Sequence, residues 1–188
     1  MSHLEKDTVQ RVRKALIDAG LEDSVIELAE TARSAEDAAA SAGCELGAIV
    51  KSLVFAVGDR LVMALVAGDH QCKEDTLAAA LNLSGDIRRP QASEVKGATG
   101  FSIGGVAPVG LLHNLPVVID RSLKRFDDIF AAAGHPHCVF RTNVDDLKRL
   151  TGGIVSWNIA EPIDQSLDSA PLARSKTFLK MAEETMTS

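Results

Sequence analysis

One lysine lies in an otherwise apolar, β-branched segment of the chain. Residues 49–57 favour a strand, and strand alternation places Lys51 on the same face as Ile49 and Leu53. An ammonium group on such a face costs free energy unless it reaches a partner or a cleft. Lys51 is therefore a candidate functional residue, although a lysine near a strand end can also extend its charge to water.

A second candidate lies in the glycine-rich segment 99–110, where Gly104 and Gly105 follow one another. Glycines permit positive φ and close backbone approach, so consecutive N–H groups can converge on an anion or a polarised carbonyl. The segment has neither the Gly-Lys-Ser/Thr ending of a Walker loop nor the spacing of a dinucleotide-binding loop. An anion-binding loop and a plain turn between two strands both stay open.

The sequence Gly134-His-Pro-His-Cys138 brings two imidazoles and a thiol together. Its spacing matches no common structural zinc site and no acidic ligand is placed beside it, so we expect no metal and no other cofactor. A turn before a strand, with one exposed histidine, is the plainer interpretation. Near a cleft that histidine could donate a hydrogen bond or exchange protons. A zinc enzyme using His135, His137 and Cys138 is kept as a weaker alternative.

The composition limits the classes of function. The 188 residues are 46% hydrophobic and 24% charged, which favours one globular domain with a sizeable core. A net charge of −6 argues against a DNA-binding protein of the repressor kind, although a local basic patch stays open. The polar N-terminus and the lack of a long apolar run predict no signal peptide and no membrane association. Three cysteines without a Cys-x-x-Cys pair indicate reduced thiols and a cytoplasmic location.

The spacing of apolar residues predicts the elements that must position these groups. Residues 49–57 and 61–67 form a predicted hairpin around Gly58-Asp59. Further strands are predicted at 24–29, 115–119, 138–141 and 154–159, and helices at 3–19, 34–43, 73–83, 92–98, 122–133 and 143–150. Because helices and strands intermix without a regular βαβ rhythm, we predict an α+β fold with a mixed sheet. Residues 161–188 form a polar tail with a predicted closing helix at 172–184.

Several separated blocks together resemble the YbaK/prolyl-tRNA-synthetase-associated editing family. The similarity runs from about Val25 to Ile159, and the order, spacing and identity of the blocks agree. Members are freestanding aminoacyl-tRNA deacylases or the editing insertion of prolyl-tRNA synthetase. The blocks are Gly47–Phe55 with its lysine, Glu94-Val95, Thr99–Gly110 and Pro116–Asp120.

The resemblance implies a single editing domain, here residues 1–160, in which helices surround a curved, barrel-like mixed sheet. It also implies hydrolysis of the ester between a tRNA, usually the tRNA for proline, and a small wrong amino acid such as alanine, cysteine or serine. The family's strand lysine falls on Lys51. Its Gly-x-x-x-Pro loop falls on Gly104, Gly105, Val106, Ala107 and Pro108.

On this interpretation Lys51 and the amides of Gly104 and Gly105 carry catalysis. The partner is the acceptor end of an aminoacyl-tRNA, and prolyl-tRNA synthetase is a second candidate partner. The alternative is a non-catalytic module that binds tRNA acceptor ends or a synthetase; the lysine and the intact loop favour the enzyme. The predicted substrate-binding residues are Ile49, Leu53, Ile103, Val106, Ala107, Pro108, His135 and His137.

Overall fold

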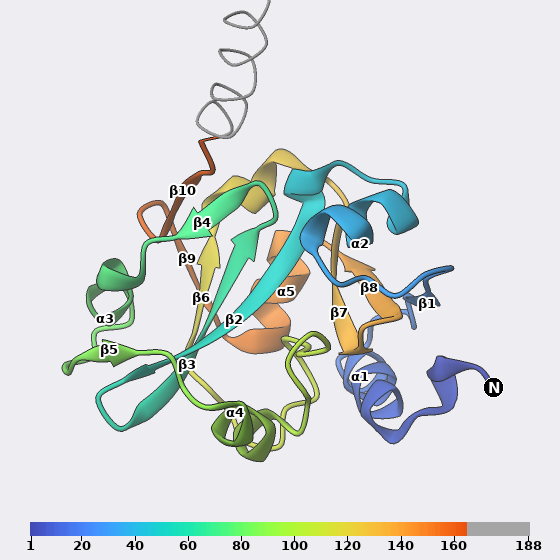
Figure 1. Cartoon of the computed structure of the whole chain (residues 1–188), viewed down its shortest axis with the longest axis horizontal. Helices are drawn as coiled ribbons and strands as arrows, with labels where there is room; N and C mark the ends of the chain where they lie inside the picture. Colours follow the sequence, from blue (N-terminus) through green and yellow to red (C-terminus); the bar gives the residue numbers. More distant parts are fainter. Residues whose placement is uncertain (165–188) are drawn as a thin grey trace, which may run out of the picture.

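The structure, a computed structural model, describes residues 1–164, and a long hairpin lies at its centre (Figure 1). Strand β2 (Ile49–Val57) pairs along its whole length with β3 (Arg60–Ala67). The two-residue turn between them contains Gly58, whose φ of 58° suits a tight hairpin turn. The predicted hairpin is confirmed.

Further strands extend the sheet on both sides of this hairpin. The order is β1-β8-β7-β2-β3-β6-β9, with β5 paired to the end of β2, and a second small sheet pairs β4 with β10. The pairs β2–β7, β3–β6 and β6–β9 are parallel and the rest are antiparallel. The sheet curls, as Figure 1 shows, and this confirms the α+β class with a curved mixed sheet. The remaining strands are β1 (Val25–Glu27), β4 (His70–Cys72), β5 (Ile87–Arg88), β6 (Val117–Asp120), β7 (Ile129–His135), β8 (Cys138–Thr142), β9 (Ile154–Ser156) and β10 (Ala160–Pro162).

Helices lie around this sheet (Figure 1). Side-chain caps define two of them, since Ser34 and Asn143 each accept a hydrogen bond from an N–H of the first turn. No helix among residues 1–164 has the length and apolar character needed to cross a bilayer. The α-helices are α1 (Asp7–Asp18), α2 (Ala35–Ala42), α3 (Leu77–Ala80), α4 (Ala92–Thr99) and α5 (Val144–Thr151), and 3₁₀ turns span His3–Glu5, Leu46–Ala48, Glu74–Thr76 and Arg121–Arg125.

The hairpin is buried on both faces. Val50 and Val54 of β2 pack into the larger core cluster, whereas Leu53 and Phe55 belong to a second cluster on the opposite face. Strand β3 is buried almost throughout, which explains its continuous run of apolar residues.

The prediction of a helix at 122–133 is wrong. The chain instead makes the 3₁₀ turn Arg121–Arg125 and then enters β7. The alanines at 131–133 favour a helix in isolation, but here pairing with β2 and β8 decides the conformation. Ile129, Ala131 and Ala133 are buried at alternate positions, as in a strand, but the uniformly apolar sequence of 129–133 does not show this alternation.

Other boundaries also differ from the prediction. The short strands β4, β5 and β10 were not predicted, the helix at 73–83 shrinks to a 3₁₀ turn followed by α3, and the strand at 154–159 ends at Ser156. Strands of two or three residues carry little periodicity, and the equally short β1 and β9 were predicted only as parts of longer segments. Strand β10 crosses the predicted domain boundary at residue 160, and the predicted helix at 172–184 lies outside the described residues.

A buried carboxylate ties the end of β3 to the turn after β6. Asp120 is 4% exposed; it accepts hydrogen bonds from the Ala67 N–H (3.1 Å), the Ser122 N–H (2.9 Å) and the Ser122 hydroxyl (2.7 Å).

We predict that Asp120→Ala lowers the free energy of unfolding by about 2 kcal/mol, because the buried Ala67 N–H loses its acceptor. Urea denaturation measures this. Ser122→Ala should cost clearly less, and equal losses in the two variants would contradict the prediction.

Candidate functional site

The sheet has a gap along one edge of β2. On the side away from β3, β7 pairs only with Ile49 and Val50, and β5 pairs only with Ala56 and Val57. Between these points β2 has no strand partner on that edge among the described residues. Strand β7 contains a bulge between Ala132 and His135, just beyond its last pair with β2. A cleft of about 790 Å³ opens along the gap.

The cleft receives side chains from both faces of the sheet. Cys72 lines it and packs with the cluster that contains Leu53 and Phe55. Val106 also lines it but belongs to the opposite cluster, with Val54. The cleft therefore runs along the open strand edge instead of lying on one face of the sheet.

Lys51 lies in this cleft and is half-buried. Its Nζ donates a hydrogen bond to the main-chain carbonyl of His70, and it forms no ion pair with any residue of the described part of the chain. Burial lowers the pKa of Lys51, while the more distant carboxylates of Glu36 and Asp69 act in the opposite direction. An ammonium group held by one carbonyl keeps two N–H donors for a ligand.

The carbonyl that holds Lys51 is itself fixed by a charged pair. Arg125 donates two hydrogen bonds, of 2.8 and 2.7 Å, to the carboxylate of Asp69, and the His70 imidazole contacts the same carboxylate at 2.7 Å. The Arg125 guanidinium is the main reason that the pKa of Asp69 falls to about 2. The turn between β3 and β4 is thereby anchored beside the lysine.

The glycine-rich loop forms another wall. Ile103, Gly104 and Val106 line the cleft. The Gly105 N–H donates to the Ser102 carbonyl at 3.0 Å, so it closes a turn and is already used. The N–H groups of Gly104 and Val106, which line the cleft, donate to no backbone acceptor within residues 1–164. These amides, and not that of Gly105, are the donors that the loop can offer.

Close packing against β7 explains why residue 105 is glycine. A Cβ atom there would lie 3.0 Å from both the Cα and the N of His135. Gly104 has a different requirement, because its φ is 96°, a conformation that side-chain-bearing residues rarely adopt. The loop therefore rests on the bulged part of β7.

The two predicted histidines have different surroundings. His135 lines the cleft, and burial lowers its pKa. His137 contacts the Thr31 hydroxyl, and its ring stacks on that of His3 with centroids 4.3 Å apart. Among residues 1–164 no group of three or more His, Cys, Asp and Glu side chains is arranged to hold a metal ion.

Two thiols line the cleft without being activated. Burial raises the pKa of both Cys72 and Cys138 to about 11. Both are neutral thiols near pH 7 and are therefore poor nucleophiles.

The structure gathers most, but not all, of the predicted site residues. Gly105, Ala107, Pro108 and His137 do not line the cleft. Sequence reasoning missed Ser52 and Arg33, both of which line the cleft. The hydroxyl of Ser52 in an apolar strand was a usable signal, but Arg33 lies in a loop that carried none. The predicted residues that do line the cleft are Ile49, Lys51, Leu53, Ile103, Gly104, Val106 and His135.

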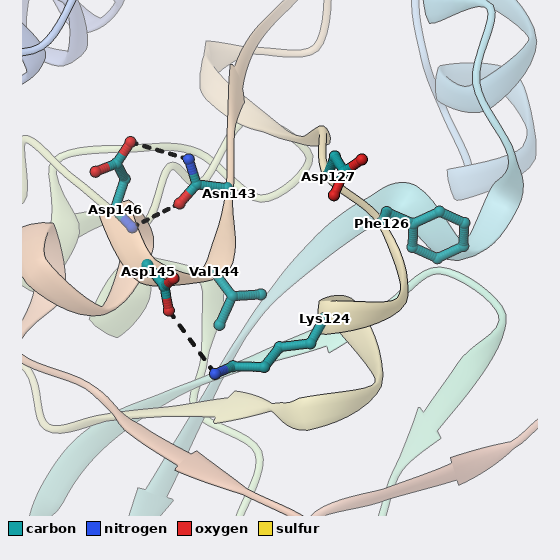
Figure 2. A pocket seen from close by; sticks show the side chains of 7 residues that line it. All are labelled: Lys124, Phe126, Asp127, Asn143, Val144, Asp145 and Asp146. Carbon is teal, nitrogen blue, oxygen red and sulfur yellow. Dashed lines mark hydrogen bonds and ion pairs between the residues drawn. The ribbon is translucent and has the colours of Figure 1, made fainter.

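A second cavity, of about 500 Å³, lies at the start of α5 (Figure 2). Its polar groups already serve the helix. The Asn143 side chain accepts from the Asp146 N–H at 2.8 Å and donates to the Asp146 carboxylate at 3.1 Å, while Lys124 lies 3.7 Å from Asp145. We assign no chemistry to this cavity. Its lining residues are Lys124, Phe126, Asp127, Asn143, Val144, Asp145 and Asp146.

Comparison with known proteins identifies the family. The sequence profile of a family described as "Aminoacyl-tRNA editing domain" matches residues 29–150. The chain is 35% identical over 128 residues to the Bacillus subtilis (strain 168) protein named "Uncharacterized protein YwhH", a match covering 68% of this chain and 80% of that one. It is also 34% identical over 93 residues to a proline--tRNA ligase of Solidesulfovibrio magneticus, but this match covers 50% of the chain and only 16% of the ligase.

A solved structure agrees with this grouping. A protein provisionally described as a trans-editing enzyme for prolyl tRNA synthetase superposes with a TM-score of 0.77 and 35% identity, covering 83% of this chain and 98% of that one. The chain belongs to the aminoacyl-tRNA editing domain family, as the resemblance indicated.

We predict that the Arg125–Asp69 pair stabilises the fold by about 1 kcal/mol near neutral pH, since both side chains are partly exposed and solvent screens them. The pKa of Asp69 is about 2 in the folded chain, below its ordinary value of 3.8. The contribution is therefore complete above pH 3.8 and is lost as the pH falls through about 2. Unfolding curves of Arg125→Ala and the wild type should converge over this range. Lys14→Ala, which breaks an exposed pair with Asp18, is the matched control and should have a smaller effect at every pH.

We predict that Gly105→Val destabilises the protein by about 1–3 kcal/mol, because the new side chain has to displace the main chain at His135. Gly97→Val is the matched control: Gly97 lies in α4, and a Cβ there meets nothing within 4 Å. Thermal unfolding of both variants tests the contact. Equal melting temperatures would show that the loop does not rest tightly on β7.

Proposed function

We propose that this protein is a trans-editing deacylase that hydrolyses the ester of a mischarged tRNA. The observation that supports this best is the cleft itself, where an ammonium group without a carboxylate partner lies in the same cavity as a loop with unused amides. Membership of the aminoacyl-tRNA editing family supplies the substrate class. We place the protein in the cytoplasm, where aminoacyl-tRNAs are made and used.

The reaction needs little from the side chains, because an aminoacyl ester is already activated. Water attacks the ester carbonyl, the carbonyl oxygen becomes an oxyanion, and the bond to the ribose oxygen then breaks, with a proton passing to that oxygen. The amides of Gly104 and Val106 are candidates to stabilise the oxyanion, an effect typically worth ~10²–10³ in rate. The neighbouring ribose hydroxyl of the terminal adenosine is a candidate to relay the proton, which fits a cleft whose thiols are neutral.

Lys51 is assigned the role of holding the tRNA end. Its two remaining N–H donors suit a phosphate or a ribose oxygen, which a lysine binds as a point charge. Arg33 and Arg89 line the same cleft at its rim, although Arg89 also pairs with Glu74 at 2.5 Å. A local group of cations of this kind allows an acidic protein to bind one end of a nucleic acid.

The apolar side chains of the cleft are proposed to select the amino acid that is removed from the tRNA. Ile49, Leu53, Ile103 and Val106 line the cleft with apolar side chains. Such a wall suits alanine, cysteine or serine, which a synthetase pocket for proline rejects poorly because small size differences change binding by only ~1–3 kcal/mol. The similarity to proline--tRNA ligases supports the tRNA for proline as the substrate and prolyl-tRNA synthetase as a partner.

We predict that Lys51→Ala lowers the rate of deacylation roughly 10- to 100-fold, the effect expected from the loss of hydrogen bonds to a charged group. The fold should survive, since removal of Lys51 leaves only the His70 carbonyl without this donor. Release of labelled amino acid from Ala-, Cys- and Ser-tRNA for proline measures the rate, and thermal unfolding checks the fold. Lys14→Ala, on the exposed side of α1, is the control. A normal rate in folded Lys51→Ala would remove this residue from the mechanism.

The non-catalytic module is the competing function. It predicts that the wild-type protein binds these tRNAs but releases no amino acid from any of them. That result would replace the deacylase proposal, whereas release from at least one of them supports it.

A further inference from the structure

The hydrogen-bonding pattern of the central hairpin determines which main-chain groups of β2 face the gap. The Gly68 N–H donates to the Ile49 carbonyl at 2.8 Å, so the odd-numbered residues of β2 direct their N–H and C=O groups toward β3. The even-numbered residues point the opposite way. Val50 meets β7 there and Ala56 meets β5.

Ser52 and Val54 are therefore the two residues whose main-chain groups point into the cleft. Both line it, and neither has a strand partner on that edge among residues 1–164. The side-chain hydroxyl of Ser52 is buried, and within residues 1–164 it has no hydrogen-bond partner. A buried hydroxyl is almost always satisfied, so the unpaired Ser52 hydroxyl beside this open strand edge points to a ligand.

The order of these groups restricts the ligand to one that presents a donor beside an acceptor. Along an extended edge the C=O of residue i is followed by the N–H of residue i+2, which gives an acceptor beside a donor. Adenine offers the complement on one edge, because its N6 amino group donates and its neighbouring N1 accepts. Guanine and hypoxanthine have the opposite pattern at these two positions, with an oxygen acceptor and an N1–H donor.

We propose that the open edge of β2 is a binding site for an adenine base, with the Ser52 carbonyl accepting from N6 and the Val54 N–H donating to N1. This rests on the proposed function in one respect: the base is then that of the adenosine that ends every mature tRNA. The site lies between the two faces of the sheet, with Lys51 on one and Val106 on the other. The edge thus recognises the base, while the groups already described act on the ribose, phosphate and ester.

The first experiment compares two probes that cannot be hydrolysed. They are 3′-amino-3′-deoxyadenosine and 3′-amino-3′-deoxyinosine, each carrying alanine through an amide bond. We expect the adenosine compound to bind roughly 10- to 100-fold more tightly in calorimetry, the discrimination that a two-point base contact provides. In ¹⁵N-labelled protein its binding should shift the amide signal of Val54. Equal affinities for the two compounds would overturn the proposal.

A variant tests the donor directly. Val54→Pro removes the proposed N–H, and it leaves the pairing with β3 intact because that N–H faces the gap; proline is tolerated at open strand edges for this reason. We expect this variant to lose the preference for adenosine, whereas Val54→Ala, which keeps the N–H, should retain it. A preference that persists in folded Val54→Pro would overturn the proposal. If Val54→Pro does not fold, the comparison of the two compounds in the wild type decides.

These measurements separate the two proposals. A protein that prefers the adenosine compound but hydrolyses no aminoacyl-tRNA supports the adenine site and removes the deacylase. A protein that hydrolyses aminoacyl-tRNA but binds both compounds equally keeps the deacylase and removes the adenine site.

Discussion

The site depends on one incomplete strand pairing. Strand β2 is saturated by β3 on one edge, but on the other β7 and β5 reach only its two ends. A fully paired β2 would leave no space for a ligand and no free main-chain groups. The bulge in β7 accompanies the divergence of the two strands, and His135, on the far side of that bulge, becomes part of the cleft wall.

The positive charge of Lys51 beside this gap has no ion-pair partner within residues 1–164. Lys51 is held by a carbonyl and not by a carboxylate, although the chain as a whole carries a net charge of −6. Asp69, the nearby carboxylate with the strongest interactions, is engaged by Arg125 and His70. The Asp69 carboxylate is therefore engaged at the turn by other residues, and the Lys51 ammonium keeps the capacity to bind an anion.

Much of this arrangement could be predicted from the sequence, and the limits have physical causes. The hairpin, the helix starts near Ser34 and Asn143 and the strand that carries Lys51 follow from local patterns, since alternation and capping involve near neighbours. The open edge could not be predicted, because it depends on where β7 departs from β2, and residues 122–133 were interpreted as a helix. Because β7 was not predicted, the packing of Gly105 against it could not be predicted either. The loop was identified as special, but which of its amides are free depends on the turn closed by Ser102.

The wall next to α2 differs in kind from the wall made by the loop. Ala35 and Ala38 bring small side chains to the cleft from a helix, whereas the loop amides are fixed by contact with the main chain of β7. Larger or smaller residues on α2 would alter the room available to a ligand without moving those amides. Related chains could in this way diverge in the size of side chain they accept while keeping one shared chemical apparatus.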